Sequence, residues 1–255
     1  MFEELSIEML LFLGVAGFIA SFIDSVVGGG GLISVPALMM TGLPLVVVLG
    51  TNKMAAFMGS ITSVVAFMRS GKIDLNLIKY LFPISAFGSA IGVYTVQLIP
   101  TDFLKPIVVG MLILVTIYSL MQKNWGEKST YTGMNRKTAI LSGIVALVMG
   151  FYDGFFGPGT GSFLLFAFLC IGFDFIMSAG NARALNFGSN IAAMIAFAYL
   201  GFVNYTYALP MGIGMVFGAI AGTKMAINKG ASYVRPLFIL MTVILIGKQL
   251  IDMLK

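Results

Sequence analysis

The chain lacks histidine altogether and has one cysteine and one tryptophan among its 255 residues. Without histidine it has no imidazole to bind a metal, and it lacks the commonest general base of enzymes. The lone cysteine, Cys170, cannot form an intrachain disulfide, and its apolar neighbours predict that it packs in the core. These absences argue against an enzyme, and they predict neither a bound metal nor a cofactor.

Charge is also scarce in this chain. Charged residues make up 10% and hydrophobic residues 59%, and the mean hydropathy is +1.01. A soluble domain has roughly 25% charged and 45–50% apolar residues, so the composition predicts a chain embedded in a lipid bilayer. The net charge of +5 suits cytoplasmic loops. No basic patch with interleaved aromatic residues occurs, which excludes nucleic acid as a partner.

Long apolar runs predict an all-α polytopic membrane protein with about eight transmembrane helices. A helical span needs about 20 apolar residues. Two further apolar pieces, 32–43 and 162–173, are too short, and each follows a glycine cluster. They are predicted to be broken or re-entrant helices, which secondary transporters use at their binding sites. The eight predicted spans are 8–27, 46–69, 76–98, 103–122, 138–156, 175–200, 205–226 and 234–254.

The sequence repeats itself at an offset of about 129 residues. Asp24 then matches Asp153, and after one inserted residue Pro106 matches Pro236. Matches of these residue types are harder to obtain by chance in so apolar a chain. The repeats are parallel if the short pieces return to their own side and inverted if they cross, and both remain open. We predict two homologous four-helix halves and a cytoplasmic linker loop between them: residues 1–122, 138–255 and 123–137 respectively.

Each half places an acid four residues before a glycine cluster, inside a predicted membrane segment. Asp in hydrocarbon is costly, and irregular backbone there is tolerated only where it lines a protein cavity. Backbone N–H groups at the start of a half-helix bind an anion without an ionised side chain. The clusters therefore predict a substrate site for a small anion, with close helix packing as the alternative. The residues concerned are Gly28, Gly29, Gly30, Gly31, Gly157, Gly159, Thr160 and Gly161.

Cationic and amide side chains lie within or at the edge of the same predicted spans. Arg183, Asn186 and Asn190 have the i, i+3, i+7 spacing of one helix face. A guanidinium grips an oxyanion through several donors, and amides donate beside it without adding charge. We predict that these residues bind the substrate, and the set is completed by Asn52, Lys53 and Asn181.

The two intramembrane acids have two possible roles. Each half carries one acid and one base, and the four charges are expected to neutralise one another as pairs. Asp24 and Asp153 either hold the neighbouring glycine loops or, in a chain without histidine, take protons that couple transport to the proton gradient.

Two long motifs make the chain resemble a known family. The first half contains Phe22-Ile23-Asp24, the Gly28–Gly31 cluster, Val35-Pro36-Ala37-Leu38 and Gly50-Thr51-Asn52-Lys53, and the second half contains Gly150-Phe151-Tyr152-Asp153-Gly154-Phe155-Phe156-Gly157-Pro158-Gly159-Thr160-Gly161. Essentially the entire chain resembles the TauE/SafE, or sulfite exporter, family, in the branch whose members are usually named probable membrane transporter proteins. The resemblance implies a multi-pass protein of the plasma (inner) membrane that transports sulfur-containing anions such as sulfite, sulfoacetate or other organosulfonates.

The sequence thus predicts a secondary active transporter, and specifically an exporter, of a small sulfur oxyanion or organosulfonate. No ATP-binding motif occurs in this chain, so a gradient would supply the energy. The expected partners are the anion and the lipid bilayer, and an oligomer is compatible with the sequence. A passive anion channel or permease and an intramembrane enzyme are the alternatives. The second half, with Thr160, Arg183 and its asparagines, is expected to set what is bound.

Overall fold

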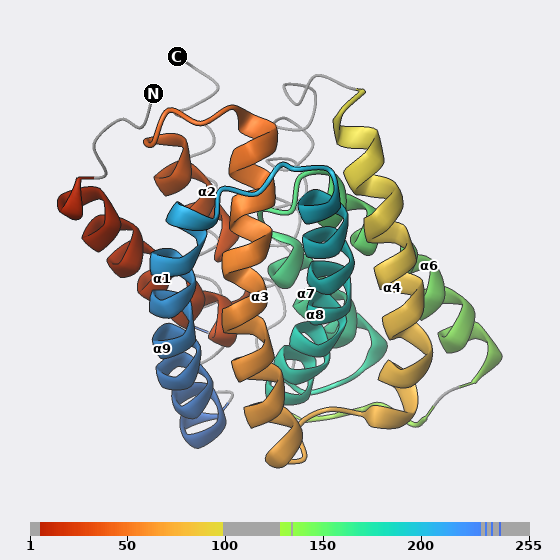
Figure 1. Ribbon diagram of the computed structural model, residues 1–255. Coiled ribbons are helices and arrows are strands. Elements are labelled where there is room, and N and C mark those ends of the chain that lie inside the picture. The colour runs from red at the N-terminus through yellow and green to blue at the C-terminus, as the bar shows by residue number, and fades with distance from the viewer. Residues whose placement is uncertain are drawn as a thin grey trace.

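The computed structural model describes residues 6–98, 128–133 and 135–230, together with residues 233, 236 and 240. Every regular element within these ranges is an α-helix, which confirms the all-α prediction (Figure 1). The spans predicted at 103–122 and 234–254 lie outside the described residues, apart from the single positions above. The described helices are α1 (Ile7–Val27), α2 (Gly31–Met39), α3 (Leu45–Arg69), α4 (Leu75–Val96), α6 (Arg136–Phe155), α7 (Thr160–Ile171), α8 (Phe175–Tyr199) and α9 (Tyr205–Lys229).

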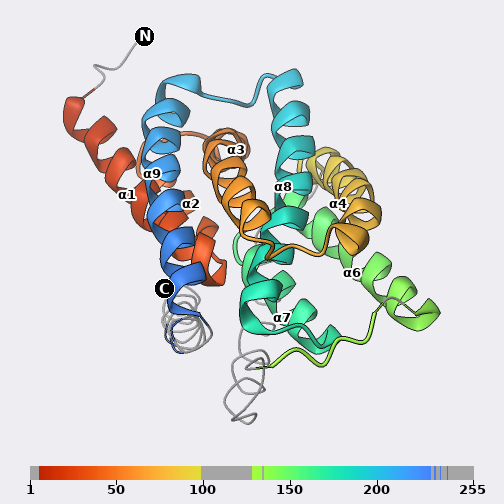
Figure 2. The ribbon, with the colours of Figure 1, turned by 90° about the horizontal axis from the view of Figure 1, so that it is seen from below.

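Five of these helices are long and apolar enough to cross a membrane: α1, α3, α4, the Thr138–Phe155 part of α6, and α9. The protein is therefore a polytopic membrane protein. The span predicted at 175–200 is present as α8, which has 25 residues but is too polar to belong to this group. Figure 2 shows α8 among α3, α4 and α7, so neighbouring helices rather than lipid cover its polar side chains.

The two short apolar pieces form α2 and α7, of 9 and 12 residues. Each begins after a glycine turn that ends the preceding long helix, and Gly28, Gly157 and Gly159 have φ values of 81°, 93° and 91°. Glycine adopts this left-handed region without steric cost. The start of α1 and the end of α2 both lie towards the upper edge of Figure 1, where α3 begins, so the two helices form a hairpin.

One residue of α7 differs from its prediction. Cys170 is exposed, so the expectation that it packs in the core was wrong. The buried face of α7 carries Leu164, Leu165 and Phe168, and Cys170 lies on the other side of the helix. Composition alone misled here, because in a membrane protein an apolar neighbourhood also describes the outer surface.

Corresponding helices of the two halves run in opposite directions. The starts of α1, α2, α3 and α4 precede those of α6, α7, α8 and α9 by 129 or 130 residues. Gly50, near the start of α3, lies against Phe202 beyond the end of α8, and Gly180, near the start of α8, lies against Lys72 beyond the end of α3. In Figure 1, α4 rises while α9 descends. Of the two arrangements that the sequence left open, the structure has the inverted one, and we propose that the two sets are homologous halves.

The two sets interlock. Helix α1 packs extensively on α9 of the other set, and α6 packs in the same way on α4. Glycines bring the backbones together, since a Cβ on Gly218 would overlap the carbonyl of Phe18 and one on Gly88 would overlap the carbonyl of Leu147. Small residues permit such close crossings between membrane helices. As a result, any cavity at the centre of the bundle is built by both sets.

Charges separate the two faces of the described structure. The connections at 40–44 and 200–204, on the face where α3 begins, contain no charged residue, and Glu8 is the one charged side chain described near them. The opposite face carries Asp74 and Asp174 together with several Lys and Arg residues. Cytoplasmic loops are enriched in Lys and Arg, so we assign this second face to the cytoplasm. Its basic residues are Arg69, Lys72, Lys79, Lys128, Arg136, Lys137, Lys224 and Lys229.

The described part of the linker lies on this same basic face. The backbone N–H of Thr130 donates to the carbonyl of Gly172 at 2.7 Å, and the Tyr131 ring stacks on Phe173. Burial raises the pKa of the Tyr131 hydroxyl, and the nearby carboxylate of Asp74 raises it further. The linker therefore contacts the turn before α8.

Candidate functional site

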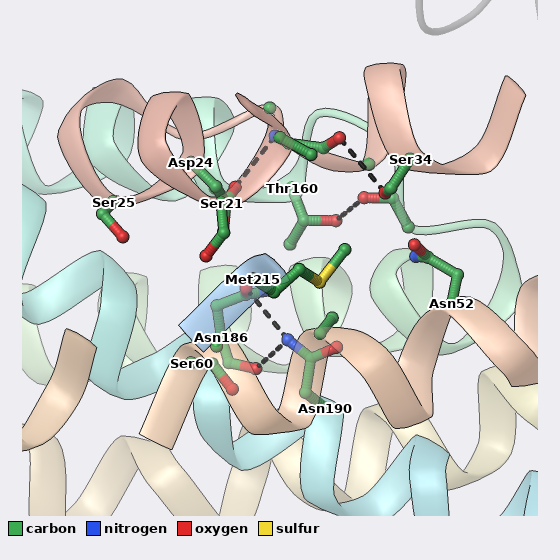
Figure 3. Close-up of a pocket in the computed structure, with 18 of the residues that line it drawn as sticks. Ser21, Asp24, Ser25, Ser34, Asn52, Ser60, Thr160, Asn186, Asn190 and Met215 are labelled. Carbon is green, nitrogen blue, oxygen red and sulfur yellow. Dashed lines mark hydrogen bonds between the residues drawn. The ribbon is translucent and has the colours of Figure 1, made fainter. Parts of the chain in front are cut away.

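A polar cavity lies at the middle of the described bundle, where the two helix breaks meet (Figure 3). Its volume is about 40 Å³, counted as space open to the centres of water-sized spheres. Helices from both sets contribute to its wall. The lining residues are Ala20, Ser21, Asp24, Ser25, Gly29, Gly30, Gly31, Ser34, Asn52, Lys53, Ala56, Gly59, Ser60, Ser63, Asp153, Gly157, Gly159, Thr160, Gly161, Arg183, Asn186, Asn190 and Met215.

The two glycine clusters, separate in sequence, pack against each other. A Cβ on Gly28 would overlap the backbone of Gly161 and Ser162, and one on Gly31 would lie 3.1 Å from Pro158 Cα. The hydroxyl of Ser162 donates to the carbonyl of Val27 at 3.1 Å, which ties the start of α7 to the end of α1. Helices α2 and α7 therefore both begin at the cavity, where their N-termini contribute partial positive charge.

Asp24 and Arg183 form an ion pair at the cavity wall. The backbone N–H of Gly30 donates to Asp24 Oδ1 at 2.9 Å, and Arg183 Nη1 donates to Asp24 Oδ2. The Arg183 side chain is 3% exposed, whereas that of Asp24 is 27% exposed. Among the described residues, the buried Arg183 Nη2 has no hydrogen-bond partner. A buried donor without an acceptor costs about 1–3 kcal/mol, so this nitrogen keeps an unused capacity to donate a hydrogen bond.

Asp153 and Lys53 form a second ion pair, which is more enclosed. Lys53 Nζ lies 2.7 Å from Asp153 Oδ1, and the two side chains are 4% and 3% exposed. Ser189 Oγ donates to Asp153 Oδ2 at 2.7 Å, so both carboxylate oxygens are bound. Lys53 Nζ also lies beside Gly157, where a Cβ would come within 3.0 Å of it.

Both ion pairs join the two sets of helices. Asp24 of α1 pairs with Arg183 of α8, and Asp153 of α6 pairs with Lys53 of α3. The sequence predicted that the four charges would neutralise as pairs, and they do. It did not predict that each acid would take its base from the other half.

The predicted stripe on α8 faces the cavity. Arg183, Asn186 and Asn190 all line it, as their helical spacing indicates. Asn190 Nδ2 donates to the backbone carbonyl and to Oδ1 of Asn186, at 2.9 and 3.0 Å. Asn52 lines the opposite wall, and its buried Oδ1 has no partner among the described residues. The amides therefore add uncharged polar groups beside Arg183.

Asn181, by contrast, lies outside the cavity. Its Oδ1 accepts a hydrogen bond of 2.8 Å from the backbone N–H of Asp74, just before α4. In the other set, Thr51 Oγ1 accepts at 2.9 Å from the backbone N–H of Asn204, just before α9. Thr51 and Asn181 are 130 residues apart, as are the starts of α3 and α8, so the two residues occupy matching positions and make matching contacts, whereas Asn52 lines the cavity.

Several site residues had not been picked out from the sequence. Ser189 holds Asp153, and it could have been found because it lies between Asn186 and Asn190 on the same helix. Tyr152 fixes the second glycine turn, since its hydroxyl donates to the carbonyl of Pro158 at 2.6 Å. Other lining residues have no distinguishing sequence signal, among them Ser21, Ser25, Ser34, Ser60 and Met215.

The cavity has the chemistry of an anion site. Two acids and two bases leave it without net charge, and it adds amides, hydroxyls, helix N-termini and one unpartnered guanidinium nitrogen. Such neutral, donor-rich cavities bind anions without a large electrostatic field. Within the described ranges, no group of three or more His, Cys, Asp or Glu side chains could hold a metal ion.

Inverted sets of helices, with broken helices around a central polar cavity, are typical of membrane transporters. The chain belongs to the Sulfite exporter TauE/SafE family, whose family model matches residues 13–248. It is therefore a multi-pass membrane transporter of that family and not an enzyme, as the sequence motifs predicted.

Relatives of similar length support this assignment. "Probable membrane transporter protein ORF9" of Sinorhizobium is 36% identical, over 98% of this chain and 95% of its own length. "Probable membrane transporter protein" of Haemophilus influenzae is 35% identical over 98% and 97%, and "Probable membrane transporter protein YfcA" of Escherichia coli is 34% identical over 98% and 94%. No solved structure matches the chain significantly.

Proposed function

We propose that the protein is a secondary active transporter of the inner membrane that exports a small sulfur oxyanion such as sulfite. The observation that carries this proposal is Arg183, which lines the central polar cavity and whose buried Nη2 has no hydrogen-bond partner among the described residues. A guanidinium binds oxyanions through several directed donors. The description of the matching family, Sulfite exporter, supports the sulfur chemistry and the direction.

The size of the cavity favours a compact anion over a long one. A water molecule needs roughly 10–15 Å³ of this kind of space, so about 40 Å³ holds about three waters or one small oxyanion. Sulfite, with one sulfur and three oxygens, suits this space. An organosulfonate such as sulfoacetate would need the cavity to enlarge, so we place it second.

The substrate would contact both sets of helices at once. Arg183, Asn186, Asn190 and the start of α7 form one wall, and Asn52 and the start of α2 form the other. The proposed cycle rocks one set against the other around the bound anion, which is how inverted repeats achieve alternating access. The second set supplies the guanidinium of Arg183 and most of the hydrogen-bond donors, so we expect it to determine which anion is bound.

A ligand panel with purified protein tests the proposal. Thermal unfolding is measured with sulfite, sulfate, thiosulfate, sulfoacetate and carboxylates, and we expect sulfite to stabilise the wild type most. Arg183→Ala removes hydrogen bonds to a charged ligand, each worth about 1.5–3 kcal/mol, so its affinity should fall at least about tenfold. Arg69→Ala, an exposed arginine of the same bundle, is the matched control and should bind sulfite as the wild type does.

Transport itself is then measured in proteoliposomes. Saturable sulfite flux with counterflow of a preloaded anion identifies a carrier, whereas flux proportional to concentration without counterflow identifies a passive channel. Unchanged sulfite flux in Arg183→Ala would remove this residue from the binding site. Absence of stabilisation by every anion of the panel would refute the proposed function.

A further inference from the structure

We propose that Asp24, and not Asp153, takes up a proton when an anion binds to Arg183, so that anion and proton cross the membrane together. This inference rests on the proposed anion transport and adds the coupling ion and the residue that carries it. It comes from the unequal surroundings of two acids that occupy matching positions in the two sets of helices.

The charge of the cavity supplies the first step. Its described lining holds two carboxylates and two cationic side chains, which sum to zero net charge. A monovalent anion would leave one uncompensated negative charge near the middle of the membrane, where net charge is costly. Binding is therefore favoured if one positive charge enters with the anion.

The second step follows from competition for Arg183. Its Nη1 donates to Asp24 Oδ2, its buried Nη2 has no partner among the described residues, and the residue itself lines the cavity. An anion on Nη2 places two negative groups on one guanidinium at close range. A carboxylate that must share its cation in a poorly hydrated site favours its neutral, protonated form. By linkage, anion binding promotes protonation of Asp24, and protonation promotes anion binding to the same degree.

The third step concerns access and restraint. The Asp24 side chain is 27% exposed and receives one backbone hydrogen bond, from Gly30. The Asp153 side chain is 3% exposed, and Lys53 and Ser189 occupy both of its oxygens. A proton from water can therefore reach Asp24, whereas on Asp153 it would have to displace a buried ion pair.

The described surroundings of Asp24 hold one other carboxylate, Asp153, and both of its oxygens are already bound. Among the described lining, the charged groups facing it are Arg183 from α8, Lys53 from α3 and Asp153 from α6. The other helices around it offer glycines, hydroxyls, an aliphatic wall and Met215. Figure 3 shows Asp24 beside Ser21 and Ser25, whose hydroxyls can relay a proton through water.

The only bonds made and broken in this cycle are the O–H bonds of the transferred proton, which leaves water for Asp24 and returns to water on release. A water-borne proton binds Asp24 Oδ2, Arg183 passes from the carboxylate to the anion, and both transfers reverse on release. With a monovalent anion the loaded site is electroneutral, so the flux depends on the anion gradient and the pH gradient rather than on membrane voltage. Because the proton travels with the anion, export runs down the outward gradient of the anion and is opposed by a pH gradient that is acidic outside.

Proton uptake on binding tests the inference with purified, detergent-solubilised protein. Sulfite is added to weakly buffered protein near neutral pH, and a pH indicator records the protons taken up per sulfite bound. Subtracting the result for Asp24→Asn removes the protonation of sulfite itself. We expect a difference of about one proton, with Asp24→Asn still binding sulfite and with an affinity less dependent on pH than that of the wild type.

Ser189→Ala is the matched control. It removes a hydrogen bond from the Asp153 pair and no charge, and Ser189 is not among the residues that line the cavity. It should keep the full proton uptake. Zero difference between wild type and Asp24→Asn, loss of sulfite binding in folded Asp24→Asn, or loss of proton uptake in Ser189→Ala would each overturn the inference.

Infrared difference spectroscopy supplies a second readout, and its main measurement uses the wild type alone. Sulfite binding should produce the carbonyl band of a protonated carboxylic acid, and Asp24→Glu should shift that band. Absence of the band in sulfite-bound wild type overturns the inference while leaving the proposed transport standing. If no anion of the panel binds at all, the proposed function fails instead.

Discussion

Lys53 of α3 and Asp153 of α6 are joined by a buried ion pair, with 2.7 Å between Nζ and Oδ1. The contact links the two inverted sets of helices at the centre of the membrane. Ser189 also donates to Asp153, so this ion pair is held in place. In the matching pair of Asp24 and Arg183, the Nη2 of Arg183 has no hydrogen-bond partner among the described residues. The site thus combines one rigid ion pair with one that is free to respond to a ligand.

The fixed pair predicts a large loss of stability when one partner is removed. Lys53→Met leaves the carboxylate of Asp153 buried without its cation, and such a change typically costs about 3–5 kcal/mol. The double variant Lys53→Met/Asp153→Asn removes both charges and should recover most of this loss. Unfolding of the purified protein measures both effects. Lys79→Met, at an exposed lysine, should stay within about 0.5 kcal/mol of the wild type. If Lys53→Met were as stable as the double variant, the ion pair would not be stabilising the contact between the two sets of helices.

Gly161 predicts a close-packing effect at the helix break. A Cβ there would overlap Arg183 Nη2 and lie 2.9 Å from Gly28 Cα. Gly161→Ala should therefore cost about 1–3 kcal/mol through overpacking and should weaken anion binding by displacing the guanidinium. Gly143 of α6 meets only the tip of Ile84, at 3.9 Å, so Gly143→Ala should be neutral or stabilise the helix by up to about 1 kcal/mol. Equal effects of the two substitutions would contradict the packing of Gly161.

Asn52 lines the cavity and Asn181 does not, so the two asparagines should respond differently to substitution. Asn181→Ala removes the acceptor for the backbone N–H of Asp74, so it should destabilise the protein by about 1–3 kcal/mol. It should leave sulfite affinity close to that of the wild type. Asn52→Ala should weaken sulfite binding and leave stability close to that of the wild type, because Asn52 lines the cavity, where its Nδ2 can donate to an anion. Thermal unfolding and sulfite titration of both variants separate the two roles, and a shared pattern of effects would refute them.

The separation of charges predicts which face is cytoplasmic. In a Cys170→Ser background, Met40→Cys places a thiol on the face without basic residues, and Ser70→Cys places one on the basic face. Both positions are exposed. A membrane-impermeant maleimide should label Met40→Cys from the periplasm and Ser70→Cys only after the cells are opened. The reverse labelling pattern would place the basic face outside and contradict the assignment.

Much of the helical framework followed from local sequence. The predicted piece at 32–43 is α2, Gly31–Met39, which ends earlier than predicted because Gly42 turns the chain with a φ of 75° and Pro44 precedes α3. The stripe of Arg183, Asn186 and Asn190 was also found by its spacing, since residues on one helix face have a fixed period. These features depend on neighbours within one helix.

The contacts of Asn181 and Cys170 did not follow from local sequence. Asn181, like Asn52, is a polar residue inside a predicted span, yet it binds the backbone before α4. Cys170 has apolar neighbours, yet it is exposed. In both cases the outcome depends on which helix packs beside the residue, and neither period nor composition contains that information.

By itself, the sequence determined a membrane-embedded all-α chain, two glycine breaks with their acids, and membership of a transporter family, because composition and short motifs respond to the bilayer and to backbone geometry. Tertiary structure alone decided that the repeats are inverted, that each acid pairs with the base of the other set, and that the two glycine clusters close on one cavity. The physical reason is that ion pairing and close packing are set by distances between helices far apart in the chain, and only the interlocked packing of α1 on α9 and of α6 on α4 fixes those distances.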